Sequence, residues 1–246
     1  MAPPATIHLR PTAELAERVL LPGDPGRALA LAQLLLEQPL MFNHNRGLWG
    51  YTGTAADGAP LTIQSTGMGG PSAAIVLHEL AALGVRRAIR VGTCGALNGD
   101  LALGDLLVAR EAIAADGTSR ALGADAHVSA DAQLSAALEE AAAQHQDSDG
   151  GPAARPAHPG ARIVSTDLFY EPDAGREAQW RAAGALAVEM EAATLFAVGA
   201  RLGVQVGCVL AVSDALGTGT REHIDEDTLL AAAEAMGRLA TAALRG

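Results

Sequence analysis

The sequence VLLPGDPGRA at residues 19–28 places an apolar strand, a turn of glycine and proline, and the start of a helix in immediate succession. Strand-like apolar runs recur at residues 18–21, 61–65, 87–91, 105–108, 162–164 and 206–212. Helix-like stretches lie at residues 26–37, 71–83, 130–144, 189–202 and 226–244. Such alternation is typical of an α/β domain, in which helices cover both faces of a sheet. It predicts a three-layer αβα architecture around a central mixed β-sheet, with the chemistry in loops at the carboxyl ends of the strands.

The composition fits one domain with a large core. Hydrophobic residues make up 49% of the 246 residues and charged residues 18%, which excludes intrinsic disorder as a general description. Only 3% are aromatic, so the core must consist mainly of Ala, Leu and Val. The segment QDSDGGPAARPAHPG at residues 146–160 has the composition of a linker, but the apolar elements after it are too few to form a separate core. We interpret it as a surface loop and expect residues 1–246 to form a single domain.

The charge balance excludes several classes of partner. The chain has 17 Lys and Arg residues against 28 Asp and Glu residues, a formal net charge of −11, so an anionic ligand needs a local basic pocket and a nucleic-acid partner is not expected. Cys94 and Cys208 follow the spacing of neither zinc ligands nor secretory disulfides, which favours a reducing cytoplasm. No signal-peptide core is present, and no apolar run reaches the roughly 18 residues of a spanning helix. We therefore expect a soluble cytoplasmic protein with no membrane partner.

Three arginines lie beside glycine-rich turns. Arg27 follows the turn at residues 22–26, where free backbone amides and the helix dipole favour an anion, although any tight strand-to-helix turn prefers the same residues. Arg46 precedes a second glycine-rich stretch, and Arg90 interrupts the apolar strand AIRVGTCGAL. A buried arginine is costly unless it pairs with a carboxylate or faces a ligand, so Arg90 belongs either to a structural ion pair or to an anion site. Thr93 adds a hydroxyl donor, and together these groups are sufficient to bind phosphate.

Seven motifs then follow one another along the chain. They are PGDPGRA (22–28), NRGLWGYTGT (45–54), QSTGMGGPSAAIVLHELAALGV (64–85), IRVGTCGAL (89–97), STDLFY (165–170), AVEMEAATLF (187–196) and AVSDAL (211–216). In this order they resemble the nucleoside phosphorylase family, in the hexameric branch that contains bacterial purine nucleoside phosphorylase and uridine phosphorylase. The resemblance extends from about His8 to Asp214 and implies a phosphorylase/hydrolase-like fold.

The resemblance also implies which residues bind each part of the substrates. Phosphate is expected at Gly23, Arg27, Arg90 and Thr93, with Arg46 contributed by a neighbouring subunit. The ribose and base are expected at Met68, Phe169, Val188, Glu189, Met190 and Glu191, with His8 reaching across from the partner. A carboxylate such as Glu191 can accept hydrogen bonds from two sugar hydroxyls. Other interpretations stay open: the acidic pair as favourable residues at a helix N-terminus, Phe169 as a core residue, and His8 as a solvated histidine.

The expected reaction is the reversible phosphorolysis of purine nucleosides. Asp214, at the carboxyl end of an apolar strand, is the expected general acid to purine N7, with Ser213 beside it. An N-cap role is the competing interpretation for Asp214. Family members that accept adenosine pair this aspartate with a later arginine, and here only Arg221 is available, at a spacing that does not match well. Inorganic phosphate is the co-substrate, and neither a metal nor an organic cofactor is required.

By this resemblance Arg46 and His8 are expected to reach the site of a neighbouring subunit, which implies a homo-oligomer. The family usually forms a hexamer of three dimers. Uridine phosphorylase is the nearest rival function. Its members carry a Gln-x-Arg pair after the FY motif, whereas residues 169–184 read FYEPDAGREAQWRAAG, in which Arg176 and Gln179 imitate the pair poorly. A nucleosidase that uses water has no need of the three arginines. A binding protein without turnover is disfavoured because every candidate catalytic group is present.

Overall fold

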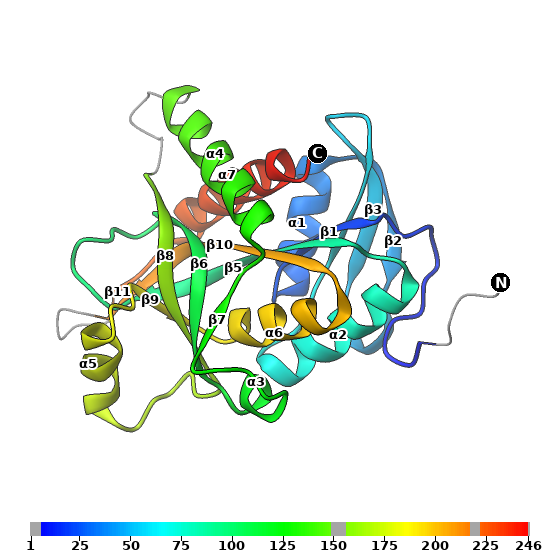
Figure 1. Cartoon of the computed structure of the whole chain (residues 1–246). Helices are drawn as coiled ribbons and strands as arrows, with labels where there is room; N and C mark the ends of the chain where they lie inside the picture. Colours follow the sequence, from blue (N-terminus) through cyan, green and yellow to red (C-terminus); the bar gives the residue numbers. More distant parts are fainter. Residues whose placement is uncertain (1–5, 149–155, 217–221, 246) are drawn as a thin grey trace.

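The computed structural model describes residues 6–148, 156–216 and 222–245, and its helices cover both faces of one mixed sheet (Figure 1). In these residues the helices are α1 Pro25–Leu35, α2 Gly70–Leu83, α3 Gly117–Ala121, α4 Ala132–Ser148, α5 Ala174–Ala182, α6 Ala192–Leu202 and α7 Glu226–Ala243. The strands are β1 Arg18–Leu21, β2 Leu36–Asn43, β3 Gly50–Ala55, β4 Pro60–Gln64, β5 Arg87–Ala96, β6 Leu106–Ala115, β7 His127–Ser129, β8 Ala157–Thr166, β9 Ala187–Glu189, β10 Gln205–Ala215 and β11 Glu222–His223. The expected α/β fold class is confirmed.

The sheet closes on itself around β10. In the described residues its order is β11-β10-β6-β8-β9-β5-β1-β4-β3-β2, and β10 also pairs with β5. β10 is parallel to β5 and antiparallel to β6, so five strands form a hydrogen-bonded circuit from which β1, β4, β3 and β2 extend. The pairing of β10 with β5 places the residues that follow Arg90 next to those that lead to Asp214. The alternation of strands and helices predicted the layers but not this closure.

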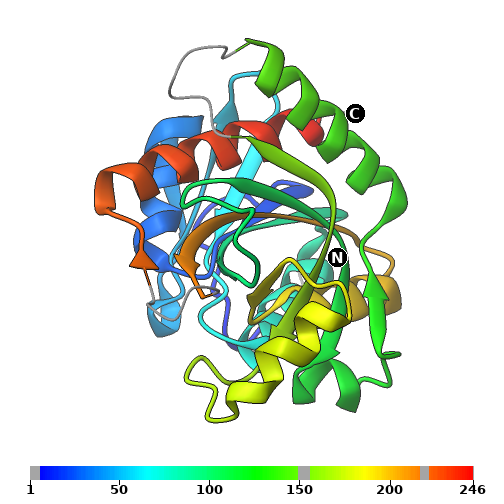
Figure 2. The same ribbon diagram turned by 90° about the vertical axis from the view of Figure 1, so that its left-hand side faces the viewer.

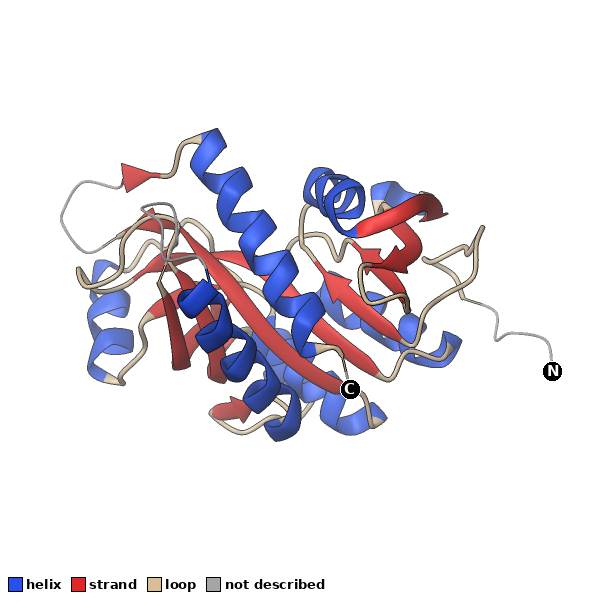
Figure 3. Cartoon of the chain, turned by 90° about the horizontal axis from the view of Figure 1, so that it is seen from above, coloured by secondary structure: helices blue, strands red, loops and turns tan. Residues whose placement is uncertain are grey.

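Each face of the sheet has its own apolar core. On one face α2 and α6 contribute Leu77, Leu80, Leu195 and Val198. On the other face α1, α4 and α7 lie together above the strands, and these helices contribute Leu31, Leu138, Met236 and Leu239 (Figure 3). α1 and α7 approach closely, because a Cβ at Gly237 would lie 2.7 Å from Cδ2 of Leu31. Small side chains therefore allow the close packing that a core with few aromatic residues requires.

Several predicted boundaries were wrong. The helix expected at residues 26–37 ends at Leu35, because the next residues form the edge strand β2, where Gln38 has a φ of 46° and Pro39 cannot donate a backbone hydrogen bond. The helix expected at residues 189–202 begins at Ala192. The loop expected at residues 146–160 is shorter, since α4 ends at Ser148 and β8 begins at Ala157, while residues 149–155 lie outside the described part. The glycine-rich stretch after Arg46 was expected to be a turn, but it forms the strand β3.

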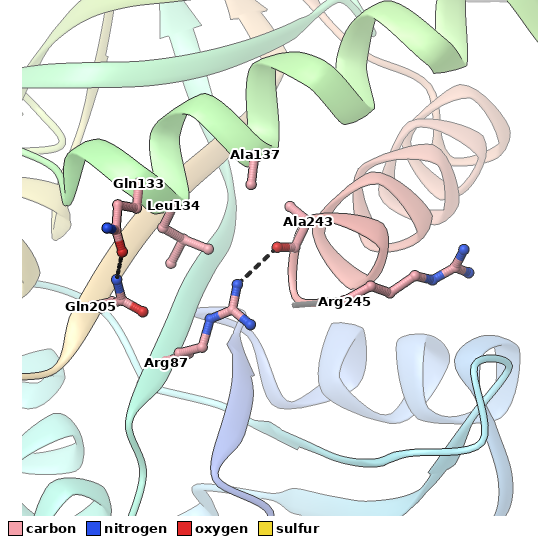
Figure 4. A pocket seen from close by; sticks show the side chains of 7 residues that line it. All are labelled: Arg87, Gln133, Leu134, Ala137, Gln205, Ala243 and Arg245. Carbon is pink, nitrogen blue, oxygen red and sulfur yellow. Dashed lines mark hydrogen bonds between the residues drawn. The ribbon is translucent and has the colours of Figure 1, made fainter.

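Parallel strands bring the candidate residues to one end of the sheet. β1, β4, β5 and β10 run in the same direction, and Figure 2 looks at the end where β5 and β10 finish, near β9, β11 and α5. A hollow of about 260 Å³ lies at the opposite ends of β5 and β10, where Arg87 donates to the carbonyl of Ala243 and Gln205 to Gln133 (Figure 4). In the described residues, no helix combines the length and apolar character that crossing a bilayer requires.

Candidate active site

Arg90 on β5 forms the centre of the site. Its side chain is almost fully buried, and its Nε lies 2.8 Å from Oε2 of Glu189 while its Nη2 lies 2.5 Å from Oε2 of Glu191. Burial alone lowers the pKa of Arg90, but the charges of Glu191 and Glu189 raise it further than that, so the net pKa lies above the ordinary value for arginine. The ion pair that the sequence left as one of two interpretations is present.

The two carboxylates are held by short segments around β9. Glu189 accepts hydrogen bonds from the Ser165 hydroxyl and from the backbone N–H groups of Glu191 and Ala192. Glu191 directly precedes α6, and its Oε1 accepts a hydrogen bond of 2.5 Å from the backbone N–H of Gly69. Burial and the charge of Glu189 raise the pKa of Glu191 more than the charge of Arg90 lowers it. Glu191 therefore links α6, β5 and the glycine turn before α2.

The ion pairs with Glu189 and Glu191 leave one nitrogen of the Arg90 guanidinium without a hydrogen-bond partner among the described residues. This nitrogen is Nη1, and it is buried. A buried donor without a partner costs about 1–3 kcal/mol, which is tolerated most readily where a ligand supplies the acceptor. The neighbouring glycine makes room for the group, because a Cβ at Gly92 would lie 2.7 Å from Cζ of Arg90. The structural ion pair and an anion site are therefore compatible at this arginine.

Arg27 lies close enough to Arg90 for their charges to repel. Burial lowers the pKa of Arg27 and the charge of Arg90 lowers it further, while Asp24 acts in the opposite direction. The guanidinium of Arg27 makes no hydrogen bond or ion pair to the rest of the described chain. Two arginines that repel each other, one of them without a salt-bridge partner, are typical of a site for an anion.

The turn before α1 differs in one respect from the sequence-based interpretation. Asp24 caps the helix by accepting hydrogen bonds from the backbone N–H groups of Gly26 and Arg27, at 3.1 and 2.9 Å. The sequence predicts that these amides are free to bind an anion, but Asp24 occupies them. The arginine side chains therefore provide the positive charge. Gly23 lies against the glycine turn before α2, because the N–H of Gly67 in that turn donates to the carbonyl of Gly23 at 3.0 Å. Thr93 is partly exposed near the end of β5.

The residues expected at the ribose and base are unequally buried. Met68, between Gly67 and Gly69, is 87% exposed, and Phe169 is 54% exposed. Val188 and Met190 are partly buried on either side of Glu189. Phe169 is therefore not a core residue, which removes one of its two interpretations. Its ring meets that of Tyr170 edge to face, with centroids 5.1 Å apart.

Asp214 lies on β10 opposite Gly95 of β5, just after a register shift that follows Val212. Its side chain is 13% exposed, and the Ser213 hydroxyl donates to Oδ2 at 2.8 Å. Asp214 does not cap a helix, because it lies within a strand. Arg221, the predicted partner, lies outside the described residues. The sequence analysis missed His223, whose Nδ1 lies 3.1 Å from Oδ1 of Asp214.

His8 lies beside the turn that carries Arg46, because the Asn45 side chain contacts its backbone. Glu79 of α2 accepts hydrogen bonds from the ring Nδ1 of His8 at 2.8 Å and from its backbone N–H. The side chain of Asn45 donates to the carbonyl of His8 at 2.9 Å, which holds His8 beside the Arg46 turn. Arg46 is exposed and adopts a φ of 58°, a strained conformation for a residue with a side chain. His8 is therefore anchored rather than idle in solvent.

Comparison with known proteins identifies the family. A model of the phosphorylase superfamily matches residues 17–245. The chain belongs to the phosphorylase superfamily. The family match continues past Asp214 to α7, which the motifs alone had left unassigned.

Several known proteins are similar to this chain along most of its length. A DeoD-type purine nucleoside phosphorylase of Clostridium novyi is 39% identical over 84% of this chain and 85% of its own. Another from Caldanaerobacter subterraneus is 37% identical over 87% and 89% of the two chains. A guanosine phosphorylase of Halorubrum lacusprofundi is 36% identical over 87% and 85%. The names of these relatives agree with the substrate class expected from the motifs.

Proposed function

We propose that this chain is a purine nucleoside phosphorylase, which converts a purine ribonucleoside or deoxyribonucleoside and phosphate into free base and ribose or deoxyribose 1-phosphate. One observation carries the proposal. Arg90 uses two donors to hold Glu189 and Glu191 and retains Nη1 beside the charge of Arg27. The guanidinium of Arg90 therefore contributes positive charge to a site for an anion and also holds a carboxylate that can bind sugar hydroxyls. Joining phosphate to a sugar requires these two sites side by side.

In the proposed reaction, the arginines orient a phosphate oxygen toward C1′ of the sugar. The bond between C1′ and the base then breaks, positive charge develops on the sugar, and the base carries the bonding electrons away. Asp214 donates a proton to N7, so the purine leaves as a neutral molecule. General acid catalysis of this kind contributes about 10²- to 10⁴-fold to the rate. The residues at the site provide binding, orientation and a proton, and the reaction as proposed uses neither a metal nor an organic cofactor.

The assembly that we propose is a homo-oligomer whose sites are shared between subunits, as a hexamer of three dimers. The anchoring of His8 beside Arg46 supports this, since one surface of a subunit then presents both residues to a neighbour. The proposed setting is the salvage of purines in the cytoplasm, which agrees with two free, buried cysteines.

A panel of inosine, guanosine, adenosine and uridine, each assayed with and without phosphate, tests the function. We expect release of free purine only when phosphate is present, and little reaction with uridine. Equal rates without phosphate would identify a nucleosidase, and a preference for uridine would identify a uridine phosphorylase. The guanosine-phosphorylase relative makes the comparison of guanosine with adenosine the most informative pair in the panel.

A further inference from the structure

His223 lies beside the proposed general acid, on the two-residue strand β11. This strand pairs antiparallel with β10 in a register that sets His223 opposite Asp214. The backbone N–H of Ile224 donates to the carbonyl of Ser213 at 2.9 Å, which extends the pairing by one further bond. Nδ1 of His223 then lies 3.1 Å from Oδ1 of Asp214. The backbone therefore holds the imidazole against the carboxyl group.

The contact connects a largely buried carboxyl group with water. The side chain of Asp214 is 13% exposed, whereas that of His223 is 67% exposed. The other carboxyl oxygen, Oδ2, accepts the hydrogen bond from Ser213. When Nδ1 of His223 carries a hydrogen, it can donate that hydrogen to Oδ1 of Asp214. An imidazole exchanges protons readily with water near neutral pH, which a serine hydroxyl does not.

We propose that His223 is a positioning residue that supplies Asp214 with the proton for the leaving purine, an inference that rests on the proposed function. The Nδ1–H bond of the protonated imidazole breaks and an O–H bond forms on the carboxylate of Asp214. Asp214 passes a proton to N7 as the bond between C1′ and N9 breaks. The bonding electrons remain on the base, while a phosphate oxygen bonds to C1′. The imidazole is left neutral and takes up its next proton from water.

The test compares two substrates that differ in their need for a proton. Inosine needs one at N7, whereas the base of 7-methylguanosine already carries a positive charge and leaves as a neutral molecule. We expect His223→Ala to lower kcat for inosine by roughly 10- to 100-fold while the KM for phosphate stays unchanged. The kcat for 7-methylguanosine should change by less than about threefold. His223→Asn keeps a hydrogen-bond donor that cannot ionise, so it should remain slow with inosine.

A matched control is available elsewhere in the chain. His127 on β7 forms a similar contact, with Nδ1 2.9 Å from Oε1 of Glu111, and His127→Asn should leave both substrates unaffected. Full activity of His223→Asn with inosine would overturn the proposal by reducing His223 to a hydrogen-bond donor. Equal losses with the two substrates would overturn it as well, since they would indicate a structural role. Failure of the wild-type protein to release base from either nucleoside with phosphate would instead refute the proposed function.

Discussion

Glu191 and Arg90 form an ion pair, 2.5 Å between Oε2 and Nη2, that joins the residue before α6 to the middle of β5. About a hundred residues of sequence separate the two elements, and neither side chain has significant access to water. In such a place a charge is tolerated only because its partner is present. The same arginine therefore has a structural task and a proposed part in binding phosphate.

Replacing Arg90 with Ala should affect stability and substrate binding together. We expect the free energy of unfolding to fall by about 3–5 kcal/mol, because two buried carboxylates lose their counter-ion, and the KM for phosphate to rise. Chemical denaturation and phosphate titrations measure the two effects. Arg110→Ala is the control, because Arg110 is 60% exposed and its pair with Glu139 is worth less than about 1 kcal/mol. A stable Arg90→Ala protein with unchanged phosphate dependence would contradict both assignments.

Arg27 should behave differently, because no hydrogen bond or ion pair of its side chain to the described residues would be lost. Arg27→Ala should leave the stability of the ligand-free protein nearly unchanged and weaken phosphate binding. An anion that binds only the folded state stabilises it by about 2.7 kcal/mol at a hundred times its Kd. Thermal unfolding with and without excess phosphate should therefore show a shift in Tm for the wild type and a much smaller one for Arg27→Ala. Identical shifts would place the phosphate elsewhere.

Mixing two impaired variants tests whether the site is shared. Arg46→Ala should lose phosphate affinity, and Asp214→Asn should lose roughly 10² in kcat. If a complete site takes Asp214 from one subunit and Arg46 from its neighbour, re-associated mixtures contain hybrid dimers with one intact site. The mixture should then recover about a quarter of the wild-type activity, as random pairing in a two-fold dimer requires. Absence of recovery, with hybrid formation verified by differential tagging, would assign Arg46 to its own subunit.

Asp57 provides a test of pH dependence away from the site. Both of its oxygens lie 2.6 Å from the guanidinium of Arg18, and the hydrogen bonds from Arg18 lower the pKa of Asp57 to about 2. Because this pKa lies below the ordinary value of 3.8, the stabilisation is present above pH 4 and is lost as the pH falls toward 2. Asp57→Asn should therefore be less stable than the wild type by about 1–2 kcal/mol at pH 7.

The difference between wild type and Asp57→Asn should shrink between pH 4 and pH 2, as measured by denaturant melts. Glu234→Gln is a suitable control, since Glu234 forms an exposed pair with Arg238 one helical turn away. A gap between the wild type and Asp57→Asn that stays constant with pH would mean that the charge of Asp57 does not stabilise the fold.

The layers of the fold could be predicted from the sequence because long apolar strands and helices alternate in it. The edge strands could not, since β2 and β3 contain proline, glycine and exposed residues and become strands only by pairing with each other and β4. At the site, the arginine in an apolar strand correctly signalled a buried charge, but its two carboxylate partners lie about a hundred residues away. The roles of Gly23, Thr93 and the other residues expected at phosphate, ribose and base stay predictions.

His223 shows a different limit of sequence-based reasoning. A histidine nine residues after an aspartate has no periodic pattern to mark it, and the strand that carries it has only two residues. Its proximity to Asp214 depends on the antiparallel pairing of β11 with β10, which no local sequence pattern specifies. The glycine-rich sequence LGTGT shortly after a candidate acid was the one signal that could have drawn attention to the residues beyond it.

The irregular strand β2 affects how copies of the molecule can meet. It is the last strand of the sheet in the described part of the chain, yet its pairing with β3 is interrupted between Glu37 and Leu40, around Pro39. An edge without a straight row of amides and carbonyls is a poor template for another strand, which protects against runaway polymerisation. Association at this edge must then rely on complementary side chains, such as the exposed Leu40 and Met41, rather than on continuing one sheet into the next.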